Sequence, residues 1–335
     1  MPFSSIAGHR RLIVLLSRAV ARGTLPPSLL FAGPAGVGKW RVAQATAQAL
    51  NCQTPASRDD GGYDACGTCR ACDRVARGVH VDVAAVEPDD RGSIKIDVVR
   101  DVLAPTAYRP FEGRRRVVLV RDADALEPQA QNALLKSLEE PPASTVFILT
   151  TSVPGALLPT VRSRCMRLRF GPLRETELAE LLVRDAGYDP GEARAAAALA
   201  DGSVGQALAL GSTDLAVLRD AALVLLRQAD ASPSARLQAA AALVAGPGKK
   251  ERSREDLALV LRMAASLLRD IEVLHAGADA RLLANPALAG ELAGLGRALA
   301  GERARAAFAA VDRALAALER NAGTKVVAEW LAMQV

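Results

Sequence analysis

The sequence predicts an α/β fold, with a parallel-sheet domain at the N-terminus and helical domains after it. Two observations support the sheet: a glycine-rich segment lies between an apolar run and a helical stretch, and later apolar runs lack polar alternation. A third supports the helical part, because Ala and Leu dominate and only 3% of residues are aromatic. At 335 residues, half of them apolar, we expect two or three domains.

The first elements lead to a phosphate-binding loop. A helix is expected within Ile6 to Arg22, and a Gly/Pro turn separates it from a strand at Leu29–Ala32. A second helix is expected from Arg41 to Leu50, which contain no Gly or Pro. Between this strand and helix stands Gly33-Pro34-Ala35-Gly36-Val37-Gly38-Lys39-Trp40. Strand, glycine loop and helix in this order are typical of a P-loop, in which backbone N–H groups and the helix N-terminus face a phosphate.

The P-loop is altered at one position. We expect Gly33, Gly36, Gly38 and Lys39 to bind a phosphate or another anion. The motif then calls for Ser or Thr, whose hydroxyl ligates Mg²⁺, but this sequence has Trp40. An indole has no acceptor and cannot coordinate the metal. The loop therefore lacks a part that hydrolysis needs. A chance glycine-rich turn is the alternative, which the flanking strand and helix disfavour.

Four cysteines follow the P-loop helix with the spacing C-x13-C-x2-C-x2-C, namely Cys52, Cys66, Cys69 and Cys72. Cysteines two residues apart can ligate one ion from a tight turn, and a fourth thiolate completes the closed tetrahedron typical of structural zinc. The sequence thus predicts a zinc module at about residues 52–72. Disulfides or redox chemistry are the alternatives, and a reducing cytosol disfavours them.

Further strands are predicted at Val83–Val86, Val117–Val120 and Val146–Leu149. In a working P-loop ATPase, the second of these ends in an Asp that orders Mg²⁺, followed by a Glu that polarises the attacking water. This sequence has Arg121 and Asp122 at those places. A cation at the metal position repels Mg²⁺, so Arg121 and Trp40 both indicate that Mg²⁺ binding has been lost.

Charge and hydropathy exclude some classes of function. The formal charge of +5 and the pI near 9.1 permit contact with nucleic acid, but no long Lys/Arg block argues for it. A zinc-dependent nucleic-acid binder is disfavoured, since the cysteine module lacks flanking aromatic residues and a dense basic patch. The apolar runs are too short to span a membrane, and Arg18 interrupts the N-terminal one. We expect no membrane contact and a cytoplasmic location.

Three further motifs carry a resemblance to a known family. They are Asn132-Ala133-Leu134-Leu135-Lys136-Ser137-Leu138-Glu139-Glu140-Pro141-Pro142 on a predicted helix, Ser163-Arg164-Cys165, and Gly202-Ser203-Val204-Gly205-Gln206-Ala207-Leu208. Together with the P-loop and the cysteine module, they closely resemble the clamp-loader branch of the AAA+ superfamily. The motifs cover residues 1 to about 211, and the remainder resembles the family in length and helical character.

The resemblance implies three domains: an AAA+ P-loop parallel-sheet domain (1–170) with the inserted zinc module, a small helical lid (171–211), and an all-helical collar for association of five subunits (212–335). Periodicity agrees with the last two, although a helical bundle without a partner would have the same periodicity. In the collar region it predicts helices at Leu215–Gln228, Ala235–Val244, Arg254–Leu274 and Glu302–Arg320.

The resemblance also assigns nucleotide-handling residues. Arg164 matches the arginine that enters the ATP site of a neighbouring subunit in this family, an arginine finger that is catalytic in trans. A solvated surface arginine is the alternative. Active members have a nucleotide-sensing arginine three residues after the Gly of the Gly-Ser pair, where this chain has Gly205. Trp40, Arg121 and Gly205 therefore depart from the active pattern, while Arg164 is retained.

This pattern implies a clamp-loader subunit of the replicative DNA polymerase III holoenzyme. We expect it to bind no productive ATP, to have no intrinsic ATPase, to hold structural zinc, and to complete a neighbour's ATPase site while a sliding clamp is loaded onto primed DNA. The implied partners are gamma/tau-type motor subunits and a delta-type subunit in a hetero-pentamer, with the clamp and primer–template DNA met through the complex. The alternative is an ATP-hydrolysing motor subunit of the gamma/tau type.

Overall fold

The structure, a computed structural model, describes residues 2–211, 215–246 and 251–335. It divides into two units: Met1–Arg174 with Ser203–Gly205, and Glu175–Gly202 with Gln206–Val335. The first unit corresponds to the predicted sheet domain, and the second groups the predicted lid with the C-terminal helices. The boundary predicted between lid and collar adjoins residues 212–214, which lie outside the described residues. The division into three domains therefore stays a prediction.

A five-stranded sheet forms the centre of the first unit, with the order β4-β5-β6-β1-β7 and every neighbouring pair parallel. Every residue of β1 and β6 is buried, as expected for strands covered on both faces. The four predicted strands are confirmed, as β1 (Ser28–Ala32), β4 (Val83–Val86), β5 (Arg116–Val120) and β6 (Thr145–Thr151). The fifth, β7 (Met166–Arg169), was not predicted.

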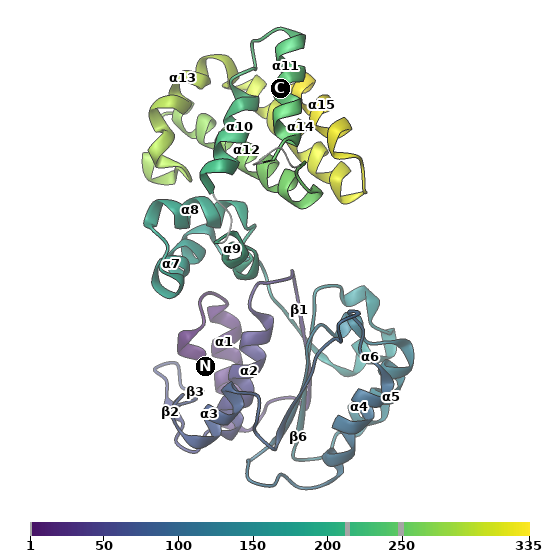
Figure 1. Ribbon diagram of the computed structural model, residues 1–335. Coiled ribbons are helices and arrows are strands. Elements are labelled where there is room, and N and C mark those ends of the chain that lie inside the picture. The colour runs from purple at the N-terminus through teal and green to yellow at the C-terminus, as the bar shows by residue number, and fades with distance from the viewer. Residues whose placement is uncertain (1, 212–214, 247–250) are drawn as a thin grey trace. The chain divides into compact units, whose positions relative to one another are not determined.

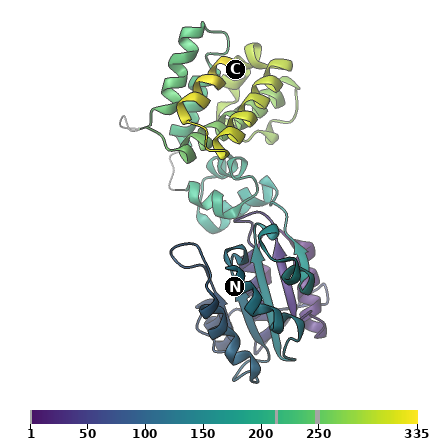
Figure 2. The same cartoon turned by 90° about the vertical axis from the view of Figure 1, so that its right-hand side faces the viewer.

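Helices cover both faces of this sheet (Figures 1 and 2). On one side lie α1 (Arg10–Arg22), α2 (Lys39–Asn51) and α3 (Arg70–Ala76), and on the other α4 (Ile96–Leu103), α5 (Pro128–Glu139) and α6 (Pro159–Arg164). Short 3-10 turns occur at Phe3–Ser5, Ala104–Ala107, Ala123–Ala125 and Pro154–Ala156. The core under α5 and α6 joins strand residues such as Val118 and Leu149 to Leu134, Leu138 and Val161 from the helices.

The helix predicted within Ile6 to Arg22 is confirmed, and it begins at Arg10. The backbone before it has positive φ at Gly8 (69°) and at His9 (50°), a conformation that a right-handed helix excludes. This turn places His9 against the P-loop: its Nε2 lies 2.7 Å from the Val37 carbonyl oxygen, and its ring meets Phe170 edge-on with 4.9 Å between centroids. The start of α1 is thereby fixed by a tertiary contact.

An antiparallel hairpin, β2 (Ala56–Ser57) and β3 (Tyr63–Asp64), stands between α2 and α3. It is not predicted by the sequence pattern, since each strand has only two residues. The Asp64 carboxylate accepts hydrogen bonds from the backbone N–H groups of Phe3 (2.7 Å) and Ser4 (2.8 Å) and lies 3.4 Å from Arg58. The hairpin is thus tied to the N-terminal segment.

Among the described residues of the second unit, every regular element is a helix (Figure 2). The longest helix, α12, packs against α10, α13 and α14, and Ser253 and Asp256 form a capping box at its N-terminus. Two helices, α13 and α15, were missed by the periodicity; α13 contains three glycines, which are poor helix formers. The bounds are α7 (Glu175–Ala186), α8 (Pro190–Leu199), α9 (Val204–Leu210, shared with the first unit), α10 (Leu215–Leu226), α11 (Pro233–Val244), α12 (Arg254–His275), α13 (Ala289–Leu299), α14 (Glu302–Glu319) and α15 (Thr324–Gln334).

A search of the described helices for a bilayer-spanning segment is negative, because none of them is both long enough and apolar enough.

The edge strand β7 approaches β1 closely where both strands end. The Phe170 N–H donates to the Ala32 carbonyl oxygen (2.8 Å), and a Cβ atom added to Gly33 would lie 2.1 Å from the Phe170 carbonyl oxygen. That oxygen belongs to the backbone and cannot rotate away. Gly33 is therefore required by packing, apart from any role in binding phosphate.

We predict that Gly33→Ala lowers the free energy of unfolding of the first unit by about 1–3 kcal/mol, the usual cost of overpacking. Urea unfolding followed by fluorescence measures it, in a Trp330→Phe background that leaves Trp40 as the single tryptophan. Gly171→Ala is the matched control, because a Cβ there meets no atom within 4 Å. An unfolding midpoint that is the same for both variants would contradict the close approach.

Candidate functional site

The P-loop connects β1 to α2, as predicted. Gly36 and Gly38 have φ values of 73° and 99°, in the left-handed region that glycine adopts without strain. These two residues reverse the chain so that α2 begins at Lys39. The loop has the strand, turn and helix N-terminus of an anion-binding nest.

Lys39 is bound to its own loop. It is 6% exposed, and its Nζ donates hydrogen bonds to the carbonyl oxygens of Gly33 (2.8 Å) and Pro34 (2.6 Å). Burial lowers the pKa of Lys39, while the carboxylates of Asp122 and Asp124 act in the opposite direction. The ammonium thus has two carbonyl acceptors, with two acidic residues nearby.

Trp40 and Arg121, the two residues predicted to replace Mg²⁺ ligands, contact each other. The guanidinium of Arg121 lies over the Trp40 ring, 5.8 Å from its centroid, which is a cation–π distance. Arg121 also lies 3.1 Å from Glu87 and 3.6 Å from Asp122. A stacked cation with two carboxylate partners therefore occupies the two positions that the sequence comparison with active P-loop ATPases assigned to Mg²⁺ binding.

The ends of β5 and β6 are joined by side-chain hydrogen bonds. The Asp122 N–H donates to Thr150 Oγ1 (3.2 Å), and the Thr151 hydroxyl donates to Asp124 Oδ1 (2.6 Å). The Ser152 N–H donates to the same carboxylate oxygen (3.1 Å). Asp124 is therefore engaged in holding this edge of the sheet together.

Gly205 packs directly on the P-loop turn. Its N–H donates to the Gly36 carbonyl oxygen (3.0 Å), and a Cβ atom at Gly205 would lie 3.2 Å from the Gly36 Cα. Ser203 also lies beside Gly36. At the position predicted to correspond to a sensing arginine, the backbone of Gly205 is thus in close contact with the loop.

Arg164 and the P-loop lie at opposite ends of the parallel strands. The P-loop follows the carboxyl end of β1, whereas Arg164 precedes the amino end of β7, which is parallel to β1. The five steps from Cys165 to Phe170 cover about 16 Å at roughly 3.3 Å per residue. Arg164 is thus remote from the P-loop of the same chain.

The neighbours of Arg164 fix its place. Its Nη1 donates to the Thr160 carbonyl oxygen (2.9 Å), and its Nη2 forms an ion pair with Glu139. Its side chain is about one-third exposed. The next residue, Cys165, is 8% exposed, and burial raises the pKa of its thiol to about 11, so it stays protonated near neutral pH.

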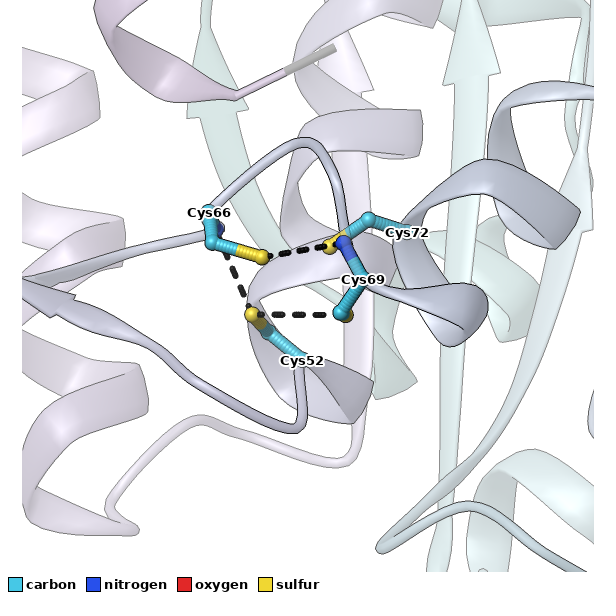
Figure 3. A group of neighbouring side chains, drawn as sticks. All are labelled: Cys52, Cys66, Cys69 and Cys72. Atoms are coloured by element: carbon cyan, nitrogen blue, oxygen red, sulfur yellow. Dashed lines mark hydrogen bonds between the residues drawn. The ribbon is translucent and has the colours of Figure 1, made fainter.

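The four predicted metal ligands converge, as Figure 3 shows. Their sulfurs all lie within 4.8 Å of one another, with 4.0 Å between Cys52 Sγ and Cys69 Sγ, and all are free thiols. Four sulfurs around one zinc at about 2.3 Å would lie about 3.8 Å apart. The donor set therefore fits a tetrahedral metal site, and it is not arranged as a disulfide.

Hydrogen bonds to sulfur favour thiolates in this cluster. The Cys66 N–H donates to Cys52 Sγ (3.2 Å), and the Cys69 N–H donates to Cys66 Sγ (3.3 Å). A hydrogen bond from the Thr54 side chain lowers the pKa of Cys66 to about 5, while burial raises the pKa of Cys52 and Cys72. A positive metal ion would offset the cost of burying these charges.

Sequence reasoning missed three residues of these sites. Glu87 follows β4 and pairs with Arg121, Thr54 faces Cys66, and Glu139 pairs with Arg164. The first two carry no sequence signal, since they lie in loops of ordinary composition. Glu139 stands inside a motif that was noticed, but its partner is 25 positions away, so the contact required the fold.

Comparison with known proteins identifies the family. Residues 8–174 match the family described as "DNA polymerase III, delta subunit". Over 180 residues the chain is 38% identical to the DNA polymerase III subunit delta' of Pseudomonas aeruginosa, covering 53% of each protein. Over 220 residues it is 31% identical to the tau subunit of Escherichia coli, covering 64% of this chain and 33% of that protein. The chain thus spans about half or less of the curated relatives it matches.

Solved structures that align with this chain include a gamma subunit-related protein of Thermotoga maritima, 19% identical, with a TM-score of 0.38 and coverage of 96% of this chain and 97% of that one. The clamp loader delta protein of Bacillus subtilis is 12% identical, with a TM-score of 0.32 and coverage of 96% and 98%. The family assignment rests on the sequence matches and on the motifs above. By these, the chain belongs to the clamp-loader family of DNA polymerase III subunits.

Proposed function

We propose that this chain is a clamp-loader subunit of the delta-prime kind, which runs no ATPase of its own and supplies Arg164 to the ATP site of a neighbouring subunit. The observation that carries the proposal is the place of Arg164, at the sheet edge opposite its own P-loop and partly exposed. An arginine so placed can serve a nucleotide held by another chain. A guanidinium there would offset the negative charge that develops during phosphoryl transfer.

The geometry of its own site supports the loss of ATPase activity. Arg121 carries positive charge where Mg²⁺ would bind, and its contact with Trp40 fills the place of the second metal ligand. Lys39 is satisfied by carbonyls of its own loop. Binding Mg–ATP would require these contacts to break and a cation to enter beside Arg121, which Coulomb repulsion opposes.

A motor subunit of the gamma/tau type is the second candidate function. It is favoured by the retained glycines and Lys39, and by relatives that include tau and gamma/tau subunits at 31–33% identity. In that case Asp122 or Asp124 would have to hold Mg²⁺. However, Asp124 Oδ1 accepts two hydrogen bonds from the end of β6 and Asp122 lies 3.6 Å from Arg121, so both carboxylates already have partners that compete with this role.

The proposed cofactor is one structural zinc ion, held by Cys52, Cys66, Cys69 and Cys72. The four sulfurs fill a tetrahedron, so no position is open for a catalytic water. The proposed partners are gamma/tau-type motors and a delta-type subunit in a hetero-pentamer, with the clamp and primed DNA reached through that assembly. The helical second unit is proposed to supply the collar, and a cytoplasmic location stays a prediction.

Nucleotide binding tests the degenerate site. We predict that the purified chain shows no magnesium-dependent ATP binding by calorimetry and no turnover. The double variant Trp40→Thr/Arg121→Asp restores both metal ligands and should gain magnesium-dependent binding by at least about tenfold, equivalent to about 1.4 kcal/mol. Each single variant should gain less, because one obstacle remains.

The chain contains a matched control for that experiment. Arg313 lies over the Trp330 ring in the second unit, 5.3 Å from its centroid, and Trp330→Thr/Arg313→Asp removes the same kind of pair away from the P-loop. This control should leave nucleotide binding unchanged. Steady ATP turnover by the unaltered chain, abolished by Lys39→Ala, would refute the delta-prime proposal and favour the motor subunit.

The finger is tested in the assembled complex with its motor subunits. Arg164→Ala should lower ATP turnover at the neighbour's site by roughly 10³-fold or more, the effect assigned to arginine fingers, and total turnover by less if other sites continue. Arg162→Ala is the control, since Arg162 is exposed and has no ion-pair partner among the described residues. Equal turnover in both variants would remove Arg164 from the mechanism.

Metal content tests the zinc module. We predict one zinc per chain by elemental analysis, lost in Cys69→Ser and retained in Cys165→Ser. Removal of the metal by a chelator should lower the unfolding temperature of the first unit by roughly 5–10 °C. Zinc-finger peptides unfold completely without zinc, but we expect a smaller effect here because the hairpin β2–β3 has contacts of its own to the N-terminal segment. Unchanged metal content in Cys69→Ser would mean that the cluster is not the binding site.

A further inference from the structure

Two motifs that are distant in sequence meet at Arg164. Glu139 is the last residue of α5 and Arg164 is the last residue of α6, and their side chains form an ion pair. Arg164 also donates to the Thr160 carbonyl oxygen one turn back in its own helix (2.9 Å). The guanidinium is therefore held from two sides.

The residues next to Glu139 and Arg164 are buried in the core. Leu138, directly before Glu139, is 4% exposed, and Cys165, directly after Arg164, is 8% exposed. These two residues belong to one hydrophobic cluster, together with Leu134 and Val161 of the same two helices. Close packing leaves little freedom at the two helix ends, so the direction of the Arg164 side chain is set mainly by its polar contacts.

The helix ends explain why the pair forms. The carboxyl end of a helix carries partial negative charge, which disfavours an acidic side chain there and favours a basic one. Glu139 stands at such an end, and Arg164 supplies the compensating cation. Lys136, one turn earlier in α5, forms no ion pair with Glu139 in the described residues. Arg164 is thus the basic residue that forms an ion pair with Glu139.

The pair leaves Arg164 able to bind a phosphate. A guanidinium has five N–H donors in a planar fork, and the Thr160 carbonyl and the Glu139 carboxylate engage two of them. The remaining N–H groups stay available on a side chain that is about one-third exposed. A carboxylate that holds one edge of the fork would orient the other edge and reduce the rotamer freedom lost on binding.

We propose that Glu139 is a positioning residue, which orients Arg164 for the phosphate of a neighbouring subunit's nucleotide. This inference rests on the proposed function of Arg164. Glu139 itself touches no nucleotide and acts through Arg164 alone. Its effect is therefore on the catalytic step at the neighbour's site, and it requires that Arg164 be present.

The test measures ATP turnover in the complex assembled with the motor subunits, using Glu139→Ala. We expect about a fivefold lower kcat, the upper limit of what an exposed ion pair supplies, with an unchanged KM for ATP. Glu139→Gln keeps an acceptor oxygen in the same place and should recover most of the rate. In the Arg164→Ala background, Glu139→Ala should have no further effect, because the residue it orients is missing.

Glu140→Ala is the matched control, because Glu140 is the adjacent exposed acidic residue and has no ion pair among the described residues. It should turn over ATP at the unaltered rate. Three outcomes would each overturn the positioning role. The turnover rate could fall equally in Glu140→Ala, it could fall on Glu139→Ala even when Arg164 is absent, or it could stay unchanged or rise in Glu139→Ala. If Arg164→Ala itself leaves turnover unchanged, the proposed function of Arg164 is wrong. If Arg164→Ala lowers turnover but Glu139→Ala does not, only the positioning role of Glu139 is wrong.

Discussion

The parallel pairing of β7 with β1 is the constraint on which the arrangement of the functional residues depends. Parallel strands send their carboxyl ends to one edge of a sheet and their amino ends to the other. The loop after β1 and the helix end before β7 must then face opposite directions. One chain thereby has its glycine loop at one end of the strands and Arg164 at the other, which agrees with the proposal that Arg164 serves a neighbouring subunit.

The altered P-loop is best understood as a set of replaced contacts. Trp40 and Arg121 are unfavourable for Mg²⁺ singly, yet together they form a stacked pair with Glu87 beside it. Gly205 donates its N–H to the Gly36 carbonyl oxygen of the loop, and a Cβ atom at Gly205 would lie 3.2 Å from the Gly36 Cα. Each residue that departs from the pattern expected of an active site therefore has a contact partner in the folded protein.

Much of the fold was predictable because its signals are local. Continuous apolar runs marked the strands, the glycine loop marked its own turn, and the cysteine spacing marked a cluster that the structure brings together. What could not be predicted depends on contacts over long sequence separation or on weak local preference. The pairs Trp40 with Arg121 and Glu139 with Arg164 belong to the first group, and α13, with its three glycines, to the second.

The two tryptophans of the chain fall one to each unit, and each lies under an arginine. Indole emission depends on polarity and on nearby charge, so Trp40 reports on the P-loop and Trp330 on the packing of α14 with α15. With no other tryptophan present, replacing either one leaves a single fluorophore. The protein thus has one intrinsic fluorescent probe in each unit, by which the unfolding of one unit can be followed separately from the other.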